Sequence, residues 1–146
     1  MDLLRFQPVM TAGIAQNPCP CDSGRAYAEC CGLWHAGAPA PDSLSLMRSR
    51  YSAYVLSNEQ YLLATWHATT RPRSIPFDAR QKWLGLSIVD TRITGDTTAE
   101  VEFVARSRLS NAAAVRLHER SRFVREAGRW YYVDGTLFEK RARKES

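Results

Sequence analysis

All four cysteines of the 146-residue chain lie in one short stretch, between positions 19 and 31. They are Cys19, Cys21, Cys30 and Cys31. A Cys-x-Cys pair and a Cys-Cys pair with eight residues between them can bring four thiolates onto one ion. Because a soft, all-sulfur ligand set is a usual shell of structural zinc, the stretch predicts one Zn²⁺ ion held by all four cysteines. Separate free thiols, a disulfide pair and an iron–sulfur cluster are the alternatives.

The residues between the two pairs suit a loop that folds back on itself. Asp22-Ser23-Gly24 is typical of a turn, and residues 25–29 can form one helical turn that delivers the second pair. Four protein sulfurs fill a tetrahedron, so no position stays open for water or substrate. We therefore expect a structural or partner-binding site with no hydrolytic role. His35 follows the last cysteine and could be a spare ligand. Because four sulfurs are already available, we expect it instead to face solvent or to lie beside the site.

Residues 19–27, Cys-Pro-Cys-Asp-Ser-Gly-Arg-Ala-Tyr, closed by Cys30-Cys31, resemble the SEC-C motif. This motif is a zinc knuckle named for the C-terminal tail of the preprotein translocase ATPase SecA. Its usual form reads C-P-C-G-S-G-K-x-Y with a C-C or H-C close. The chain departs from it at Asp22, where glycine is usual, and at Arg25, where lysine is usual. Neither residue is a ligand, so the resemblance still implies a zinc site.

Three further segments, residues 46–54, 118–123 and 128–135, resemble the uncharacterised bacterial YchJ family. The resemblance runs from about residue 17 to the C-terminus. It implies a SEC-C knuckle followed by a nuclear transport factor 2-like (NTF2-like) domain. Such a domain is a cystatin-like α+β fold, a cone of N-terminal helices packed on a curved antiparallel sheet. The family name brings no established activity with it.

Hydrophobic periodicity separately predicts helices first and strands after, which is an α+β order. Helical spacing covers residues 44–56 and 58–66, with Asp42 or Ser43 and then Asn58 as N-caps. A short third helix over 77–82 is expected to start at Asp78. Strand patterns cover residues 83–93, 99–108, 115–125 and 130–138. Short turns between these strands favour an antiparallel meander.

The expected organisation is a flexible leader over residues 1–16, the knuckle over 17–36, a linker over 37–42 and the NTF2-like domain over 43–146. The chain shows neither an apolar run that could span a membrane nor a secretory signal in its first residues. We therefore expect a cytoplasmic protein with no membrane partner. A net charge of +5 is small enough to reflect solubility alone, although it leaves room for an acidic partner.

The strand pattern also predicts one pocket, on the sheet face that the helices should cover. Its expected residues are Tyr51, Tyr54, Trp66, Glu119 and Ser121. A partly buried Glu119 is an acid–base candidate, or it pairs with Arg48, Arg50 or a tyrosine of the first helix. No HExxH motif, nucleophile elbow, phosphate-binding loop or dinucleotide fingerprint is present, so no catalytic residue is assigned.

Three functions are compatible with these features. The leading interpretation is a zinc-dependent interaction module whose knuckle contacts a protein partner. The resemblance favours it, because the SEC-C domains include one that contacts the export chaperone SecB and ribosomes. The second interpretation is a small-ligand-binding protein or enzyme that uses the cone. The third is weak nucleic-acid binding through an arginine-rich sheet face, and a homodimer through the sheet is a further expectation.

The arginine-rich face belongs to the second and third predicted strands. Its arginines are Arg106, Arg108, Arg116, Arg120 and Arg122. A strand pairing centred near residues 111–113 would set Arg108 opposite Arg116 and Glu102 opposite Arg122. This register predicts partial neutralisation of the face and weak retention on nucleic acid at low salt only.

Overall fold

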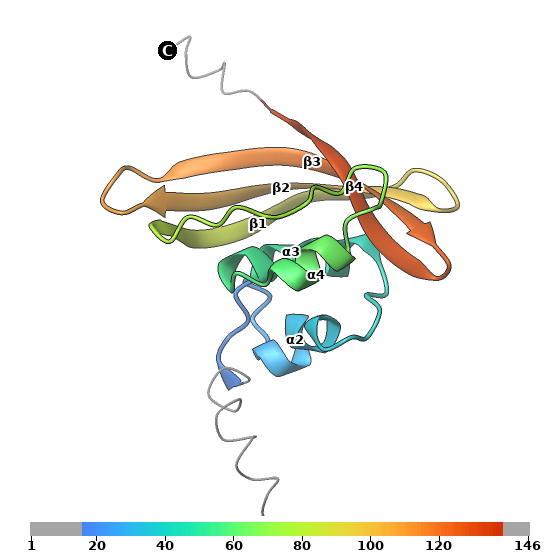
Figure 1. Cartoon of the computed structure of the whole chain (residues 1–146), viewed down its shortest axis with the longest axis horizontal. Helices are drawn as coiled ribbons and strands as arrows, with labels where there is room; N and C mark the ends of the chain where they lie inside the picture. The colour runs from blue at the N-terminus through green and yellow to red at the C-terminus, as the bar shows by residue number, and fades with distance from the viewer. Residues whose placement is uncertain (1–15, 139–146) are drawn as a thin grey trace, which may run out of the picture.

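The computed structural model describes residues 16–138, whose path is shown in Figure 1. The leader expected over residues 1–16 lies outside the described residues except for its last position, and so do residues 139–146 of the expected domain. The elements are η1 (Tyr27–Glu29), α2 (Cys31–His35), α3 (Ser43–Val55), α4 (Glu59–Ala64), β1 (Gln81–Ile93), β2 (Thr98–Leu109), β3 (Val115–Glu126) and β4 (Arg129–Leu137). Helices precede strands, as the periodicity predicts.

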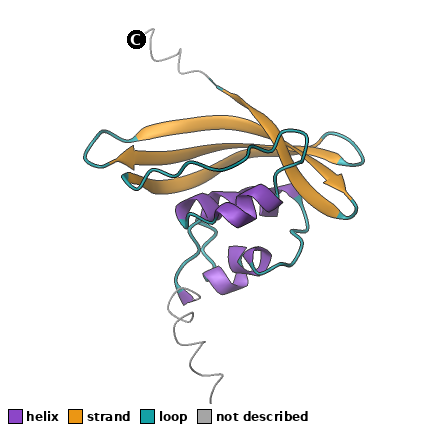
Figure 2. Ribbon diagram, viewed as in Figure 1, coloured by secondary structure: helices purple, strands orange, loops and turns teal. Residues whose placement is uncertain are grey.

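The chain forms three layers, which Figures 1 and 2 show edge-on. The four strands form one antiparallel sheet in the order β1-β2-β3-β4. Helices α3 and α4 lie against one face of this sheet, and the knuckle with α2 lies on the far side of α3. The predicted α+β fold, with helices on a curved antiparallel meander, is confirmed. No helix among residues 16–138 is long and apolar enough to cross a membrane.

The two main helices begin at the predicted caps. The Asp42 carboxylate accepts a hydrogen bond from the Ser45 N–H at 2.8 Å, and the Asn58 side-chain oxygen accepts one from the Tyr61 N–H at 3.1 Å. Each cap satisfies a backbone donor that the first helical turn leaves without a partner. The caps thus fix where α3 and α4 start, and with it the short turn between the two helices.

Alternation along β2 decides which face of the sheet is covered. Five inward residues, Ala99, Val101, Phe103, Ala105 and Ser107, are all at most 6% exposed. Side chains of successive strand residues point to opposite faces, so burying this set commits the intervening residues to the outer face. The predicted half-buried strand is confirmed, and its inner face forms the roof of the space above α3.

The short helix predicted over residues 77–82 is wrong. Asp78 caps a turn, with its carboxylate accepting from the Arg80 N–H at 2.9 Å and its carbonyl accepting from the Gln81 N–H at 2.9 Å. Strand β1 starts at Gln81, which pairs with Leu109 of β2. The same capping residue suits a turn or a helix, and pairing with the sheet decides between them.

The predicted register between β2 and β3 is also wrong, by two residues. Arg106 lies opposite Arg116, and Glu102 lies opposite Arg120. The chain turns earlier than expected because Ser110 takes a left-handed conformation, with φ of 47°, directly after β2. A register shift of two keeps every side chain on its predicted face but changes its cross-strand neighbour.

Candidate functional site

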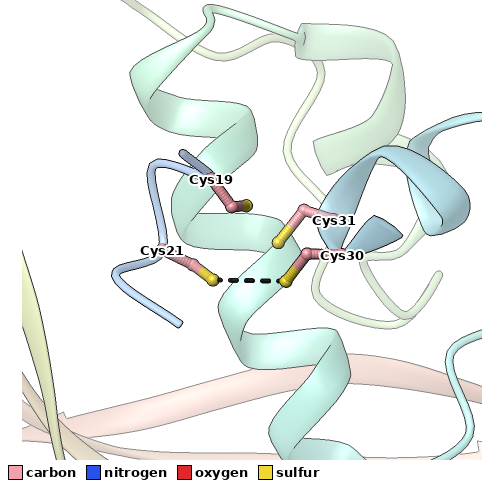
Figure 3. A group of neighbouring side chains, drawn as sticks. All are labelled: Cys19, Cys21, Cys30 and Cys31. Atoms are coloured by element: carbon pink, nitrogen blue, oxygen red, sulfur yellow. Dashed lines mark hydrogen bonds between the residues drawn. The ribbon is translucent and has the colours of Figure 1, made fainter. Parts of the chain in front are cut away.

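The four cysteine sulfurs point toward one another, as Figure 3 shows. Cys19 and Cys21 come from the loop before η1, and Cys30 and Cys31 come from the junction of η1 with α2. All four residues are buried, and their sulfurs lie within 4.8 Å of one another. An ion with four metal–sulfur bonds of about 2.3 Å needs sulfurs about 3.8 Å apart. The cluster therefore fits a single tetrahedral metal ion after small adjustments.

The contacts between the thiols show why the cluster suits a cation. Hydrogen bonds with Cys21 and Cys31 lower the pKa of Cys19, whereas the bonds with Cys19 raise the pKa of both Cys21 and Cys31. One thiolate is thus stabilised by neighbours that keep their protons. Four adjacent thiolates repel one another unless a positive ion lies between them, so metal binding and loss of the remaining protons go together.

Helix α3 supports the sulfurs from one side. The Ser52 hydroxyl lies 3.5 Å from Cys19 Sγ. Arg48 donates from Nη1 to the Cys21 carbonyl at 2.7 Å, and the same nitrogen lies 3.8 Å from Cys21 Sγ. These contacts hold the loop of Cys19 and Cys21 against α3. Arg48 is only partly exposed, because the knuckle covers this face of α3.

Asp22 ties the knuckle to the edge of the sheet. Its φ of 63° lies in the left-handed region, which explains why glycine is usual at this position of the motif. The Asp22 carboxylate accepts a hydrogen bond from the Leu86 N–H of β1 at 3.1 Å. A Cβ atom on the neighbouring Gly85 would come within 3.2 Å of that carboxylate. Asp22 thus gives the knuckle a polar contact to β1 that a glycine could not make.

His35 is not part of the sulfur cluster and joins the knuckle to α3. Its Nε2 donates to the Ser49 carbonyl at 2.8 Å, so its Nδ1 accepts from the Tyr27 hydroxyl at 2.6 Å. Burial lowers the pKa of His35, which favours this neutral tautomer. His35 is therefore a neighbour of the cysteine site and not a ligand, since it bridges Tyr27 of the motif and helix α3 behind the site.

The knuckle and the cone share one hydrophobic core. The buried residues of this core are Cys19, Cys21, Cys30, Cys31, Ala40, Leu46, Met47, Tyr51, Leu86, Val101, Phe103, Ala105 and Phe123. Sulfur ligands, residues of α3 and inward side chains of three strands therefore pack in one cluster. A change at the sulfur cluster therefore reaches the cone by direct contact.

A cavity of about 250 Å³ lies between α3 and the inner face of the sheet. The residues around it are Met47, Arg50, Tyr51, Tyr54, Trp83, Phe103, Ala105, Leu117, Glu119, Ser121 and Tyr132. Four of the five predicted pocket residues are among them. Trp66 is not, because its ring packs edge-on against Tyr132 with the centroids 5.0 Å apart. Arg50 and Tyr132 are the polar lining residues that the sequence pattern does not assign to the pocket.

The hydrogen-bond partners of Glu119 belong to the sheet and not to α3. Its carboxylate accepts from the Tyr132 hydroxyl at 3.2 Å and from the Ser121 hydroxyl at 3.4 Å. It forms no ion pair within residues 16–138, so the expected ion pair with Arg48 or Arg50 is wrong. A hydrogen bond with a tyrosine is present, but the tyrosine is Tyr132 of β4 and not one of the first helix. Burial raises the pKa of Glu119, which favours a proton on this carboxyl.

The outer face of the sheet neutralises much of its own charge. Glu102 accepts from Arg120 at 3.0 Å and lies 2.7 Å from His118 Nε2. Arg122 donates to Asp134 at 2.6 Å. His118 therefore lies on the face opposite Glu119, as the alternation predicts. These ion pairs lie in the half of the face away from the β2–β3 turn, and nearer that turn Arg106 lies opposite Arg116.

Comparison with known proteins finds a matching family for each of the two parts of the chain. The SEC-C motif matches residues 17–33, and the description "YchJ, middle NTF2-like domain" matches residues 42–135. The chain belongs to the YchJ family. Both resemblances that the sequence suggests are thus confirmed, and the match to the motif includes all four buried cysteines.

Relatives of this YchJ-family chain share most of its length. A UPF0225 protein of Xanthomonas campestris pv. campestris is 53% identical over 127 residues, which cover 86% of this chain and 98% of the relative. A UPF0225 protein of Polaromonas sp. is 60% identical over 126 residues, covering 80% and 91%. The solution structure of a SEC-C motif containing protein from Rhodopseudomonas palustris superposes with a TM-score of 0.73 at 32% identity, covering 84% of this chain and all of that one.

Proposed function

We propose that this YchJ-family chain is a zinc-dependent protein-interaction module, in which the knuckle contacts a protein partner and the NTF2-like domain supplies the scaffold. The observation that carries the proposal is the closed sulfur cluster. Four cysteines fill every position of a tetrahedral ion, so the ion has no open position for chemistry. A metal used in this way fixes the surface around it, which suits recognition.

Zinc fits the cluster better than the alternative metals. Soft thiolates select zinc or iron–sulfur clusters, and sulfurs within 4.8 Å of one another enclose one ion more readily than a cluster of several irons. The site needs reduced thiols, so we assign the protein to the cytoplasm, where thiols stay reduced. The ion would hold the loop of Cys19 and Cys21 to the start of α2.

The outer side of α2 is the candidate contact surface. Leu33 is 43% exposed there, and Trp34 beside it is half-buried. Next to them lies a groove of about 270 Å³ whose walls include Trp34, Pro39 and Trp130. Helix α4 and β4 form the other walls of the groove, and α2 with the linker forms one side, so a metal ion that holds α2 in place would help to set the shape of the groove. Aromatic and proline side chains around a groove suit an apolar segment of a partner protein.

The test combines metal analysis with partner capture. Protein prepared without chelators should contain one equivalent of zinc, and Cys30→Ser should lose most of it. The intact chain should retain specific proteins from a bacterial lysate that the Cys30→Ser variant does not retain. Well under one equivalent of zinc in the intact chain, or the same captured proteins with both variants, would contradict the proposal.

A surface variant separates the partner site from the metal. Leu33→Asp leaves all four ligands in place, so it should keep the zinc and lose the partner. Leu137→Asp is the matched control, because Leu137 is 58% exposed and lies on β4, outside the knuckle. It should keep both zinc and partner. Capture that survives Leu33→Asp would place the partner site away from α2.

A further inference from the structure

The cavity of the cone is lined largely by rings. Tyr51, Tyr54, Trp83 and Phe103 all border it. The Trp83 ring centroid lies 5.6 Å from that of Tyr51 and 6.1 Å from that of Tyr54, so the three rings form one continuous wall. A space of about 250 Å³ with such walls suits a molecule with a single ring or a short apolar chain.

One buried cation borders this apolar space. Arg50 is only 4% exposed, and its Nη1 donates to the Leu62 carbonyl at 2.9 Å and the Thr65 hydroxyl at 2.7 Å. The guanidinium lies between two rings, 4.8 Å from the centroid of Trp66 and 4.5 Å from that of Tyr132. These contacts fix its position, and they do so without any negative charge.

Arg50 has no counter-ion in the described part of the chain. No carboxylate within residues 16–138 forms an ion pair with it. Burial lowers the pKa of Arg50 to about 10, which still leaves the guanidinium charged at neutral pH. A buried charge without a partner is costly, and a guanidinium is best satisfied by two oxygens of one carboxylate.

Among residues 16–138, Glu119 is the only carboxyl group that lines the cavity. Its charge acts on Arg50 from a distance, but the two side chains form no ion pair. Its hydrogen bonds come from Tyr132 and Ser121. Gly135 of β4, which lies opposite Ser121, leaves room for the Glu119 side chain, because a Cβ atom at position 135 would lie 2.6 Å from Glu119 Cδ. The carboxyl is thus held against the sheet. With a proton, which its burial favours, it can donate a hydrogen bond into the cavity.

We infer that the cone cavity is a binding site for a small apolar monocarboxylic acid, with the carboxylate on Arg50 and the apolar part against the rings of Tyr51 and Trp83. The ligand supplies the ion-pair partner that Arg50 lacks among residues 16–138. A cation would meet Arg50 unfavourably, and a neutral molecule would leave the buried guanidinium without an ion-pair partner. This site is separate from the proposed partner surface on α2 and does not depend on it.

Phenylacetate is the probe, and phenylacetamide and 2-phenylethylamine are its neutral and cationic counterparts of almost the same shape. Titration of the zinc-loaded full chain, followed by NMR chemical shifts, should show phenylacetate bound at least about tenfold more tightly than either counterpart. The shifted signals should include those of Tyr51, Trp83 and Tyr132. Equal affinity for the amide, shifts confined to other regions, or no binding at ligand concentrations of about 10 mM would overturn the inference.

Three variants locate the site. Arg50→Met should abolish the preference for the acid over the amide. Leu117 lines the cavity and is 37% exposed, so Leu117→Trp should block entry without disturbing the core and should weaken binding of all three probes. Glu119→Gln cannot carry a negative charge and should bind phenylacetate as tightly as the parent chain or more tightly. Loss of phenylacetate binding in the Glu119→Gln variant, or unchanged binding after Leu117→Trp, would refute the proposed placement.

Discussion

Replacing Asp22 tests how firmly the knuckle is tied to the sheet. Two effects act at this position. The left-handed backbone, with φ of 63°, costs about 1–2 kcal/mol for a residue with a Cβ atom, although less for Asp and Asn. The hydrogen bond from the Leu86 N–H to a charged acceptor is worth about 1.5–3 kcal/mol when buried, and about 1 kcal/mol here because Asp22 is exposed.

These magnitudes order three substitutions. Asp22→Ala keeps a Cβ atom in the left-handed region and loses the carboxylate, so it should destabilise the chain by about 2 kcal/mol. Asp22→Gly loses the carboxylate but relieves the backbone, so its net cost should be within about 1 kcal/mol. Asp22→Asn tolerates the left-handed conformation and keeps an oxygen that can accept, so it should stay closest to the parent chain.

The assay is urea unfolding of the zinc-loaded proteins, combined with hydrogen exchange at the Leu86 amide. Exchange at Leu86 should accelerate in the Ala and Gly variants and change little in the Asn variant, because only the first two lose the acceptor. The stability order should be Asn, then Gly, then Ala. An Ala variant as stable as the Gly variant would refute the backbone argument, and unchanged Leu86 exchange in all three would refute the tie to β1.

Three further predictions concern the carboxylates and the metal. Burial raises the pKa of Glu119 in the folded chain, so the free energy of unfolding should fall as the pH rises from the ordinary value of 4.5 toward the raised pKa, and Glu119→Gln should remove this fall in urea unfolding. At Glu102 a hydrogen bond from His118 lowers the pKa, so the free energy of unfolding should rise with pH there, and Glu102→Gln should remove this rise. Gly135→Ala should cost about 1–3 kcal/mol in the same assay, and adding Glu119→Ala should recover most of it. Chelation of the metal should lower the melting temperature of the sheet, measured by circular dichroism, by several degrees. An unchanged melting temperature of the sheet in metal-free protein would contradict the shared core.

Local rules predict most of the fold because they depend on near neighbours in the chain. Asp42 and Asn58 cap helices in the structure as their positions predict, since a cap needs only its own first turn. The alternation from Ala99 to Ser107 identifies the buried face of β2, since successive side chains of a strand point to opposite faces of the sheet. The cysteine spacing likewise brings four sulfurs together through a turn of a few residues.

The errors depend on backbone conformations and contacts that the hydrophobic pattern does not specify. A β2–β3 register two residues off follows from the conformation of Ser110, which alternation cannot specify because both registers bury the same face. Asp78 is a good cap for a helix or a turn, and the decision rests on pairing between β1 and β2. Arg50 gives no sequence signal of burial, because the Leu62 carbonyl and the rings that enclose it belong to other elements.

Helix α3 explains why the knuckle and the cone act as one structure. Arg48 and Ser52 are four residues apart, so they lie on one face of the helix and reach Cys21 and Cys19. Arg50 and Tyr54 are also four residues apart and lie on another face, where both border the cavity. A helix of 13 residues that is held on both faces cannot adjust to one side without moving side chains on the other. A metal ion bound by the four cysteines would therefore do more than close a loop, because it would set the position of the helix that forms one wall of the cavity.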